Sequence, residues 1–194
     1  MESRLAGPRP LLALVTGAPG SGKTTLARRL ASELRLPLLA KDDIKETLYD
    51  QLGAPDQAAS QRLGLAALTL LRQTAERLLT AGVSVLIEAN YQRGRAEPDL
   101  RPLLALAHGV QIHCGGDPEM IVQRYRDRPA HGERHAGHFD AAALPRLREL
   151  LARGAYEPLD LGVPVLRVDT TTTGAYAPDF AAIAAFVRGP QPCP

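Results

Sequence analysis

Aromatic residues are scarce in this sequence, which has no tryptophan, three phenylalanines and five tyrosines among 194 residues. Proteins that grip single-stranded nucleic acid usually stack the bases on exposed aromatic rings. The sequence offers little material for such a stacking surface. An excess of positive charge is missing as well, because the formal net charge is only +2. Non-specific binding of nucleic acid through a basic tail is therefore not indicated.

Cysteines and long apolar runs are also few. Cys114 falls in a predicted strand and Cys193 in a proline-rich tail, which gives no disulfide framework. No apolar run approaches the roughly 20 residues that cross a bilayer, and the apolar stretch at residues 11–15 is too short for a signal peptide. We therefore expect a cytoplasmic protein that does not associate with membranes. The sequence does not indicate its oligomeric state.

Short apolar runs alternate with longer helical patterns, which indicates repeated βα units around a parallel sheet. Each run is continuously apolar, as expected for strands that helices cover on both faces. The predicted strands span residues 11–16, 36–40, 83–88, 110–114 and 163–168. The predicted helices span residues 23–34, 44–49, 57–80, 97–107, 118–128, 141–152 and 178–187. The fold class that follows is α/β, with a five-stranded parallel sheet between two layers of helices.

We expect a single domain at residues 11–188, between flexible ends at residues 1–10 and 189–194. The chain is long enough to enclose one hydrophobic core. Residues 128–140 are rich in glycine, histidine and arginine and have no periodicity. This segment is therefore predicted to be a mobile loop or lid.

The segment Gly17-Ala18-Pro19-Gly20-Ser21-Gly22-Lys23-Thr24 matches the phosphate-loop pattern G-x-x-x-x-G-K-[ST]. It follows a predicted strand and opens a predicted helix, which is the context that the motif requires. Glycines let successive backbone N–H groups curl around phosphates, and Lys23 reaches the β- and γ-phosphates. The Thr24 hydroxyl is expected to bind magnesium, with Thr25 as a weaker candidate beside it. The sequence therefore predicts a site for ATP and Mg²⁺.

Acidic residues follow two further predicted strands, at the edge of the sheet where α/β proteins bind ligands. Asp42 and Asp43 come after the second strand, and Glu88 ends the third, two residues before Asn90. A carboxylate at the first position would take the proton of an acceptor hydroxyl, and Glu88 would hold a magnesium-bound water. The alternative is that both aspartates only cap the following helix. Glu88 would then simply end a strand, and Asn90 would make a turn.

Histidines accompany the arginines of the predicted lid, at His131, His135 and His138. A zinc site needs a fourth ligand and a fixed scaffold, and the only nearby thiol, that of Cys114, belongs to a strand. We therefore expect the histidines to contact substrate or to make the polarity of the lid depend on pH.

These motifs together carry a family resemblance. The phosphate loop, Lys41-Asp42-Asp43-Ile44-Lys45, Glu88-Ala89-Asn90 and the arginines between Arg124 and Arg134 resemble the P-loop kinases of the AAA-family ATPases. Relatives of those kinases include polynucleotide kinase, the zeta toxins and chloramphenicol phosphotransferase. The resemblance covers residues 11 to 170, approximately. It implies a P-loop NTPase fold with a nucleoside-monophosphate-kinase-like sheet, an arginine-rich lid and transfer of the γ-phosphate of ATP to a hydroxyl.

The resemblance also implies roles for single residues. Asp42 matches the general base of the polynucleotide kinase motif. Lys45 stands where that family has an arginine near the acceptor, a change that removes a bidentate fork. Arg124, Arg128 and Arg134 fall where the family places its lid, and lid arginines neutralise charge during phosphoryl transfer. Arg128 ranks slightly first because it closes the helix at the lid entrance; the alternative for all three is an ordinary solvated surface.

The leading hypothesis is an ATP-dependent kinase acting on a hydroxyl of a small molecule or nucleotide. The acceptor site would contain Asp42, Lys45, Glu88 and Asn90. A polynucleotide 5′-hydroxyl kinase is the nearest alternative, weakened by the scarcity of aromatic residues. A nucleotide-dependent ATPase switch acting through protein partners is an alternative of another class.

Overall fold

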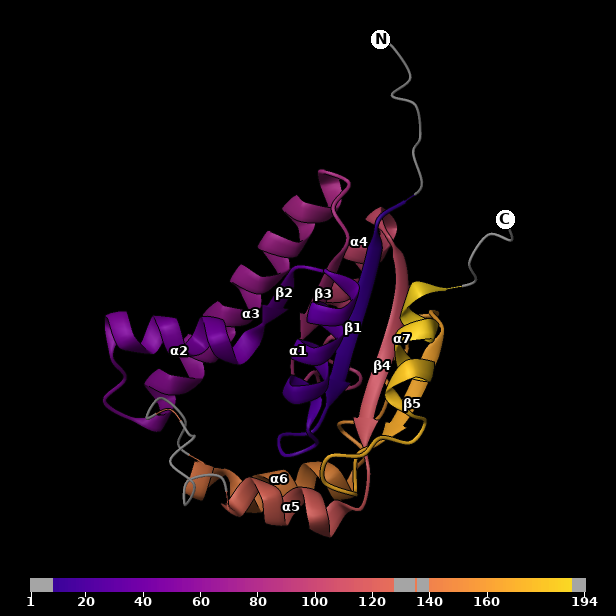
Figure 1. Ribbon diagram of the computed structural model, residues 1–194. Helices are drawn as coiled ribbons and strands as arrows, with labels where there is room; N and C mark the ends of the chain where they lie inside the picture. The colour runs from indigo at the N-terminus through magenta and orange to yellow at the C-terminus, as the bar shows by residue number, and fades with distance from the viewer. Residues whose placement is uncertain (1–8, 128–134, 136–139, 190–194) are drawn as a thin grey trace.

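The computed structural model describes residues 9–127, 135 and 140–189, and Figure 1 shows their arrangement. Parallel strands form a five-stranded sheet in the order β2-β3-β1-β4-β5. The strands span Leu11–Gly17 (β1), Leu38–Ala40 (β2), Val85–Glu88 (β3), His108–Gly115 (β4) and Val165–Asp169 (β5). Since β1 pairs with β3 on one side and β4 on the other, the loop that follows β1 lies in the middle of the carboxyl edge.

Helices cover both faces of the sheet (Figure 1). They span Lys23–Leu34 (α1), Lys41–Leu52 (α2), Gln57–Thr80 (α3), Glu97–Leu106 (α4), Pro118–Asp127 (α5), Asp140–Ala152 (α6) and Phe180–Arg188 (α7). Ala13 and Val15 of β1 pack in one cluster with residues of α1 and α7. Leu12 and Leu14 point the other way and pack with residues of α3 and α4. The predicted α/β sandwich with a five-stranded parallel sheet is therefore confirmed.

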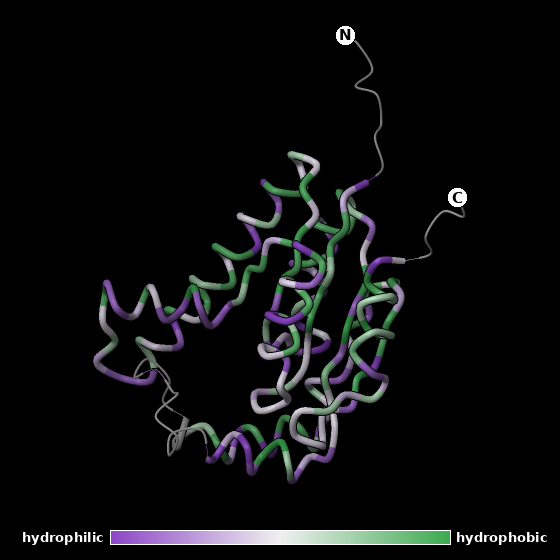
Figure 2. Tube along the Cα trace, in the orientation of Figure 1, coloured by the Kyte–Doolittle hydropathy of each residue, from purple (hydrophilic) through white to green (hydrophobic). Residues whose placement is uncertain are grey.

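The apolar residues concentrate along the central strands, as the hydropathy colouring of Figure 2 shows. Leu12, Leu14, Leu86 and Ile87 are fully buried in the sheet. Each such side chain contributes about 1.5–3 kcal/mol through removal of its surface from water. Burial from both faces is the reason why these strands have continuous rather than alternating apolar residues.

The helix pair α5 and α6 lies across the carboxyl edge of the sheet (Figure 1). Ile121 and Tyr125 of α5 pack with Leu147 and Leu150 of α6, and the same cluster includes Ala18 from the loop after β1. This packing places the helix pair directly against that loop.

Several predicted boundaries agree with the structure. The helices predicted at residues 23–34 and 57–80 are confirmed to the residue. The helix predicted at residues 118–128 begins at Pro118, and Asp117 before it accepts a hydrogen bond from the backbone N–H of Met120 at 3.0 Å. The predicted start of the second helix at Ile44 is wrong, because α2 begins at Lys41 directly after β2. Acidic residues favour the first turn of a helix through its dipole, so Asp42 and Asp43 lie inside α2.

Part of the predicted lid and most of the predicted flexible ends lie outside the described residues. The side chains concerned include Arg128, Arg134, His131, His138 and Cys193. Within the part of the chain that the structure describes, no helix is long and apolar enough to cross a membrane.

Candidate active site

The loop between β1 and α1 is closely packed between two neighbouring elements. Gly17 has a φ of 141°, and a Cβ atom there would lie 2.3 Å from the carbonyl oxygen of Cys114 on β4. Gly20 has a φ of 95°, and its Cβ would lie 2.5 Å from the carbonyl oxygen of Ile121 on α5. Both neighbours are backbone atoms of packed elements, so only glycine fits at these positions.

The same loop ends at a helix N-terminus that no side chain caps. Gly22 is the N-cap residue of α1 and makes no capping hydrogen bond from a side chain. The first N–H groups of α1 are therefore left for an anion, and the positive end of the helix dipole lies at the same position. This is the geometry of a phosphate site.

Three side chains converge beside this helix start. The Lys23 Nζ lies 3.6 Å from Glu88 Oε1, and both side chains are almost fully buried, at 5% and 3% exposure. The Thr24 hydroxyl donates to Glu88 Oε2 at 3.3 Å. Thr24 and Glu88 therefore meet, although 64 positions separate them in the chain.

The charge on Glu88 depends on its neighbours. Burial raises the pKa of this carboxyl, and the charge of Asp42 raises it further. Lys23 and the hydrogen bond from Thr24 lower it, without cancelling the effect of burial. Mg²⁺ suits this place, because it is commonly bound by one or two carboxylates together with substrate phosphates. The Thr24 hydroxyl and the Glu88 carboxylate are the oxygen atoms that would hold it.

The two aspartates of α2 point in different directions. Asp43 forms an exposed ion pair with Arg28 of α1, at 2.9 Å. Asp42 forms an ion pair with Lys41 at 3.1 Å and is close enough to Glu88 to raise the pKa of that carboxyl. Of the two carboxylates, the structure thus brings Asp42 to the centre formed with Lys23, while Asp43 lies on the surface.

The other predicted acceptor residues lie around the same edge. Lys45 is buried on α2, one turn after Asp42 and therefore on the same face of that helix. Asn90 is half-buried after β3 and hydrogen-bonds the hydroxyl of Tyr156. Burial raises the pKa of Tyr156, and the hydrogen bonds with Gln92 and Asn90 partly offset this effect. Thr25 is exposed on α1, beside Thr24.

Residues predicted for the lid are placed in two different surroundings. The Arg124 guanidinium donates to the carbonyl oxygens of Thr170 and Thr171, at 2.6 Å each, in the loop after β5. His135 lies 2.9 Å from a carboxylate oxygen of Asp50 on α2. The structure therefore brings Arg124 to the sheet edge and His135 to α2, whereas Arg128 and Arg134 lie outside the described residues.

Of the three histidines of the predicted lid, His131 and His138 lie outside the described residues. Among residues 9–127, 135 and 140–189, no group of three or more His, Cys, Asp or Glu side chains is placed to hold a metal. Cys114 is buried and free, and burial raises the pKa of its thiol to about 12, so it is not a reactive thiolate.

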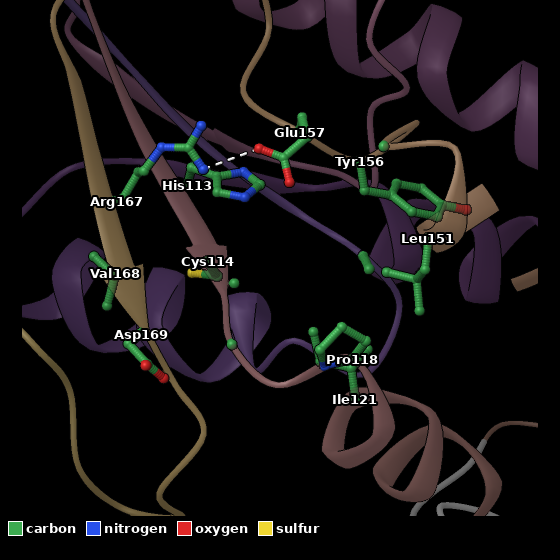
Figure 3. Close-up of a pocket in the computed structure, with 14 residues that line it drawn as sticks. His113, Cys114, Pro118, Ile121, Leu151, Tyr156, Glu157, Arg167, Val168 and Asp169 are labelled. Atoms are coloured by element: carbon green, nitrogen blue, oxygen red, sulfur yellow. Dashed lines mark hydrogen bonds and ion pairs between the residues drawn. The ribbon is translucent and has the colours of Figure 1, made fainter. Parts of the chain in front are cut away.

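A cavity of about 310 Å³ lies behind the phosphate loop, between the ends of β4 and β5 and the pair α5 and α6 (Figure 3). Its polar rim includes the ion pair of Arg167 and Glu157, at 2.9 Å. Ala18 is the one phosphate-loop residue in its lining. Lys23, Glu88 and Asp42 do not line this cavity, so it is separate from the centre between the start of α1 and the end of β3.

Thr170 is a residue that sequence reasoning missed. Its hydroxyl lies 2.8 Å from the carbonyl oxygen of Ser21 in the phosphate loop. One signal was available, because Thr170 opens a run of four threonines that begins one residue after the last predicted strand. The carboxyl ends of all parallel strands meet at one edge. A polar run after the fifth strand therefore indicates a site residue in the same way as the acidic residues after the second and third strands.

The comparisons with known proteins agree with this geometry. A family model described as "AAA domain" matches residues 12–153, which is more than half of the chain. The chain is also similar to a candidate kinase from Chloroflexus aurantiacus of known structure, with 40% identity and a TM-score of 0.82. That match covers 93% of this chain and 97% of the other.

Two curated relatives add to this result. An uncharacterized protein of Mycobacterium tuberculosis is 32% identical over 143 residues, covering 69% of this chain and 28% of the relative. The chain thus spans little more than a quarter of that protein's length. A shikimate kinase from Rhodopirellula baltica is 25% identical over 169 residues, covering 84% of this chain and 83% of the relative.

Proposed function

The chain belongs to the AAA domain family, and from this premise we propose that it is a phosphotransferase. The reaction would transfer the γ-phosphate of ATP to a hydroxyl group of a small molecule or nucleotide, as the names of the kinase relatives suggest. One observation carries the proposal. A buried lysine, a threonine hydroxyl and a carboxylate meet at the N-terminus of α1, and a second carboxylate, that of Asp42 on α2, is close enough to raise the pKa of the first.

The nucleotide would bind along the phosphate loop. Free backbone N–H groups of the loop and of the first turn of α1 would surround the phosphates, and Lys23 would place its charge on the β- and γ-phosphates. Thr24 and Glu88 hold Mg²⁺, Glu88 in part through water. When bound, Mg²⁺ neutralises phosphate charge and orients the γ-phosphate.

The acceptor would bind between α2 and the end of β3. Asp42 takes the proton of the acceptor hydroxyl while the oxygen of that hydroxyl forms a bond to the γ-phosphorus. The bond from that phosphorus to the bridging oxygen of the β-phosphate breaks, and ADP leaves. Lys45 and Asn90 would orient the acceptor.

The remaining charge would be neutralised by arginines of the lid. Arg128 and Arg134 are the candidates for this role, each able to contribute by a factor of roughly 10³ to 10⁵ if correctly placed. Arg124 was a third candidate. Its contacts with the loop after β5 support a different role, which is developed below.

A small-molecule acceptor is favoured by the relative named shikimate kinase and by the scarcity of aromatic residues for base stacking. The test is ADP release by the purified chain with ATP and Mg²⁺, alone and with nucleosides, nucleotides, sugars, hydroxylated acids, antibiotics and 5′-hydroxyl oligonucleotides. We expect one acceptor class to stimulate ADP release and to become phosphorylated, and the Lys23→Ala variant to lose this activity.

The outcomes distinguish the alternatives. Phosphorylation of the oligonucleotides would indicate a polynucleotide kinase. Equal ATP hydrolysis with and without every acceptor would contradict the proposed transfer and favour an ATPase switch. Full activity of Lys23→Ala would remove the phosphate loop from the mechanism.

A further inference from the structure

Thr170 lies beneath the phosphate loop, where its hydroxyl reaches two carbonyl groups. Thr170 follows β5 and is buried, with 4% of its surface exposed. Its Oγ1 lies 2.8 Å from the carbonyl oxygen of Ser21 and 2.8 Å from that of Gly115. The backbone N–H of Thr170 already donates to Gly115, at 2.9 Å. The Gly115 carbonyl therefore keeps a donor when the Thr170 hydroxyl is removed.

The bond to Ser21 sets the direction of the next N–H group. In a trans peptide the C=O of one residue and the N–H of the following residue point in opposite directions. Because the Ser21 carbonyl points to Thr170, the N–H of Gly22 points away from Thr170. This N–H belongs to the N-cap residue of α1, where a phosphate oxygen is expected.

Ser21 is held by its backbone rather than by its side chain. Its N–H donates to the carbonyl of Ala18 at 3.1 Å, and its carbonyl accepts from Thr170. Within the described residues, its buried hydroxyl has no hydrogen-bond partner. The contact with Thr170 is therefore an important restraint on the rotation of the Ser21–Gly22 peptide.

Arg124 supports the loop that carries Thr170. Its guanidinium donates to the carbonyl oxygens of Thr170 and Thr171, and it also contacts the hydroxyl of Thr173 at 3.3 Å. Such a fork fixes both the position and the orientation of the backbone it binds. The helix of Arg124, α5, also touches the other side of the phosphate loop, at Gly20. Contacts from α5 thus reach the loop directly and through Thr170.

From these contacts we propose that Thr170 is a positioning residue of the nucleotide site. It holds the Ser21–Gly22 peptide so that the Gly22 N–H faces the phosphates, and Arg124 acts through it. The inference rests on the proposed function only in that the loop binds the polyphosphate of a nucleotide. It needs no knowledge of the acceptor.

Binding of the polyphosphate alone is the measurement that tests this role. We would titrate wild type, Thr170→Val, Thr170→Ala and Thr170→Ser with ATP, ADP and inorganic tripolyphosphate, each with Mg²⁺, by calorimetry well below the unfolding temperature. Removal of the hydroxyl leaves a buried carbonyl without its donor and frees the peptide to rotate. We expect Val and Ala to weaken ATP and tripolyphosphate by the same factor, roughly tenfold. Serine, which keeps the hydroxyl, should restore binding to within about twofold of wild type.

Two controls separate positioning from general stability. Thr172→Val alters an exposed threonine of the same loop and should leave every affinity unchanged. Arg124→Met should weaken tripolyphosphate as well, but should add little to the effect of Thr170→Val in the double variant, because both changes release the same peptide. Fully additive effects would contradict the claim that Arg124 acts through Thr170.

The results also distinguish this inference from the proposed function. Wild-type affinity for tripolyphosphate in both Val and Ala variants, or a loss confined to ATP, would overturn the role of Thr170. A lower unfolding temperature without weaker binding would do the same, since it indicates a purely structural hydroxyl. If Lys23→Ala also bound nucleotide normally, the proposed function itself would fail.

Discussion

At the scale of single residues, two neighbouring aspartates show how side-chain direction decides a role. Asp42 and Asp43 are adjacent in the first turn of α2, and both suit the positive end of that helix. Only Asp42 contributes to the electrostatics of Glu88, whereas Asp43 pairs with Arg28 at the surface. Their chemistry is the same, but of the two charges only that of Asp42 shifts the pKa of Glu88, the carboxyl that pairs with Lys23.

A matched pair of variants tests this difference. Asp42→Asn should bind ATP normally and slow transfer by roughly 10² to 10⁴, because it removes a positioned base. Asp43→Asn should keep nearly full activity, since an exposed ion pair contributes about 0–1 kcal/mol to stability. The measurements are kcat with the stimulating acceptor and ATP affinity for both variants. Loss of transfer in Asp43→Asn with an active Asp42→Asn would reverse the assignment.

At the scale of elements, the start of α4 shows how one buried carboxylate holds two segments together. Glu97 Oε1 accepts from the backbone N–H of Gly94 at 3.0 Å and from that of Asp160 at 3.2 Å. The first hydrogen bond closes the turn before α4. The second connects the segment that leads into β5 to the start of α4. The same segment carries Tyr156, whose hydroxyl holds Asn90. If Asn90 contributes to the acceptor site as proposed, this anchor helps to position it.

Removing the anchor should cost stability. Glu97→Ala removes the shared acceptor of two part-buried backbone hydrogen bonds and should lower the free energy of unfolding by about 1–3 kcal/mol. Asp99→Ala is the matched control, because Asp99 is an exposed acid in the same first turn and should change stability by at most about 1 kcal/mol. Urea unfolding of the three proteins measures the difference. Equal stability of both variants would show that the two hydrogen bonds contribute nothing net.

At the scale of the whole molecule, the polar groups inside the fold make its stability depend on pH. His113 of β4 is 5% exposed, and its Nδ1 lies 3.4 Å from the Thr16 hydroxyl. Burial lowers the pKa of His113 from 6.5 to about 4; the charge of Glu157 acts against this shift, and that of Arg167 adds to it. The unfolded chain therefore takes up a proton at this histidine at a pH where the folded chain does not.

The sign of the effect follows from this difference. Where the unfolded state binds more protons than the folded state, a lower pH reduces stability. The contribution of His113 is therefore lost as the pH drops from about 6.5 to about 4. We expect it to amount to about 1–3 kcal/mol over that window. His113→Asn should flatten this part of the profile of unfolding free energy against pH. His108→Asn, at an exposed position on the same strand, should leave it unchanged. Parallel profiles for wild type and His113→Asn would contradict the prediction.

Local features of the sequence were sufficient for the fold class, for two helices to the residue and for the phosphate loop. Apolar periodicity depends on which faces are buried, and the glycines of the loop meet local needs of the backbone, so both are readable without tertiary contacts. The start of α2 was misread because acids before a helix and acids inside its first turn look alike in sequence.

Only the tertiary structure decided which side chains share the site. Asp42 was separated from Asp43 by its position near Glu88, and Arg124 was placed on the loop after β5 rather than in the lid. Thr170 reaches Ser21 across 149 positions of sequence. Such pairs arise because parallel strands bring distant segments to one edge, and the direction of each side chain there depends on packing that no local pattern encodes.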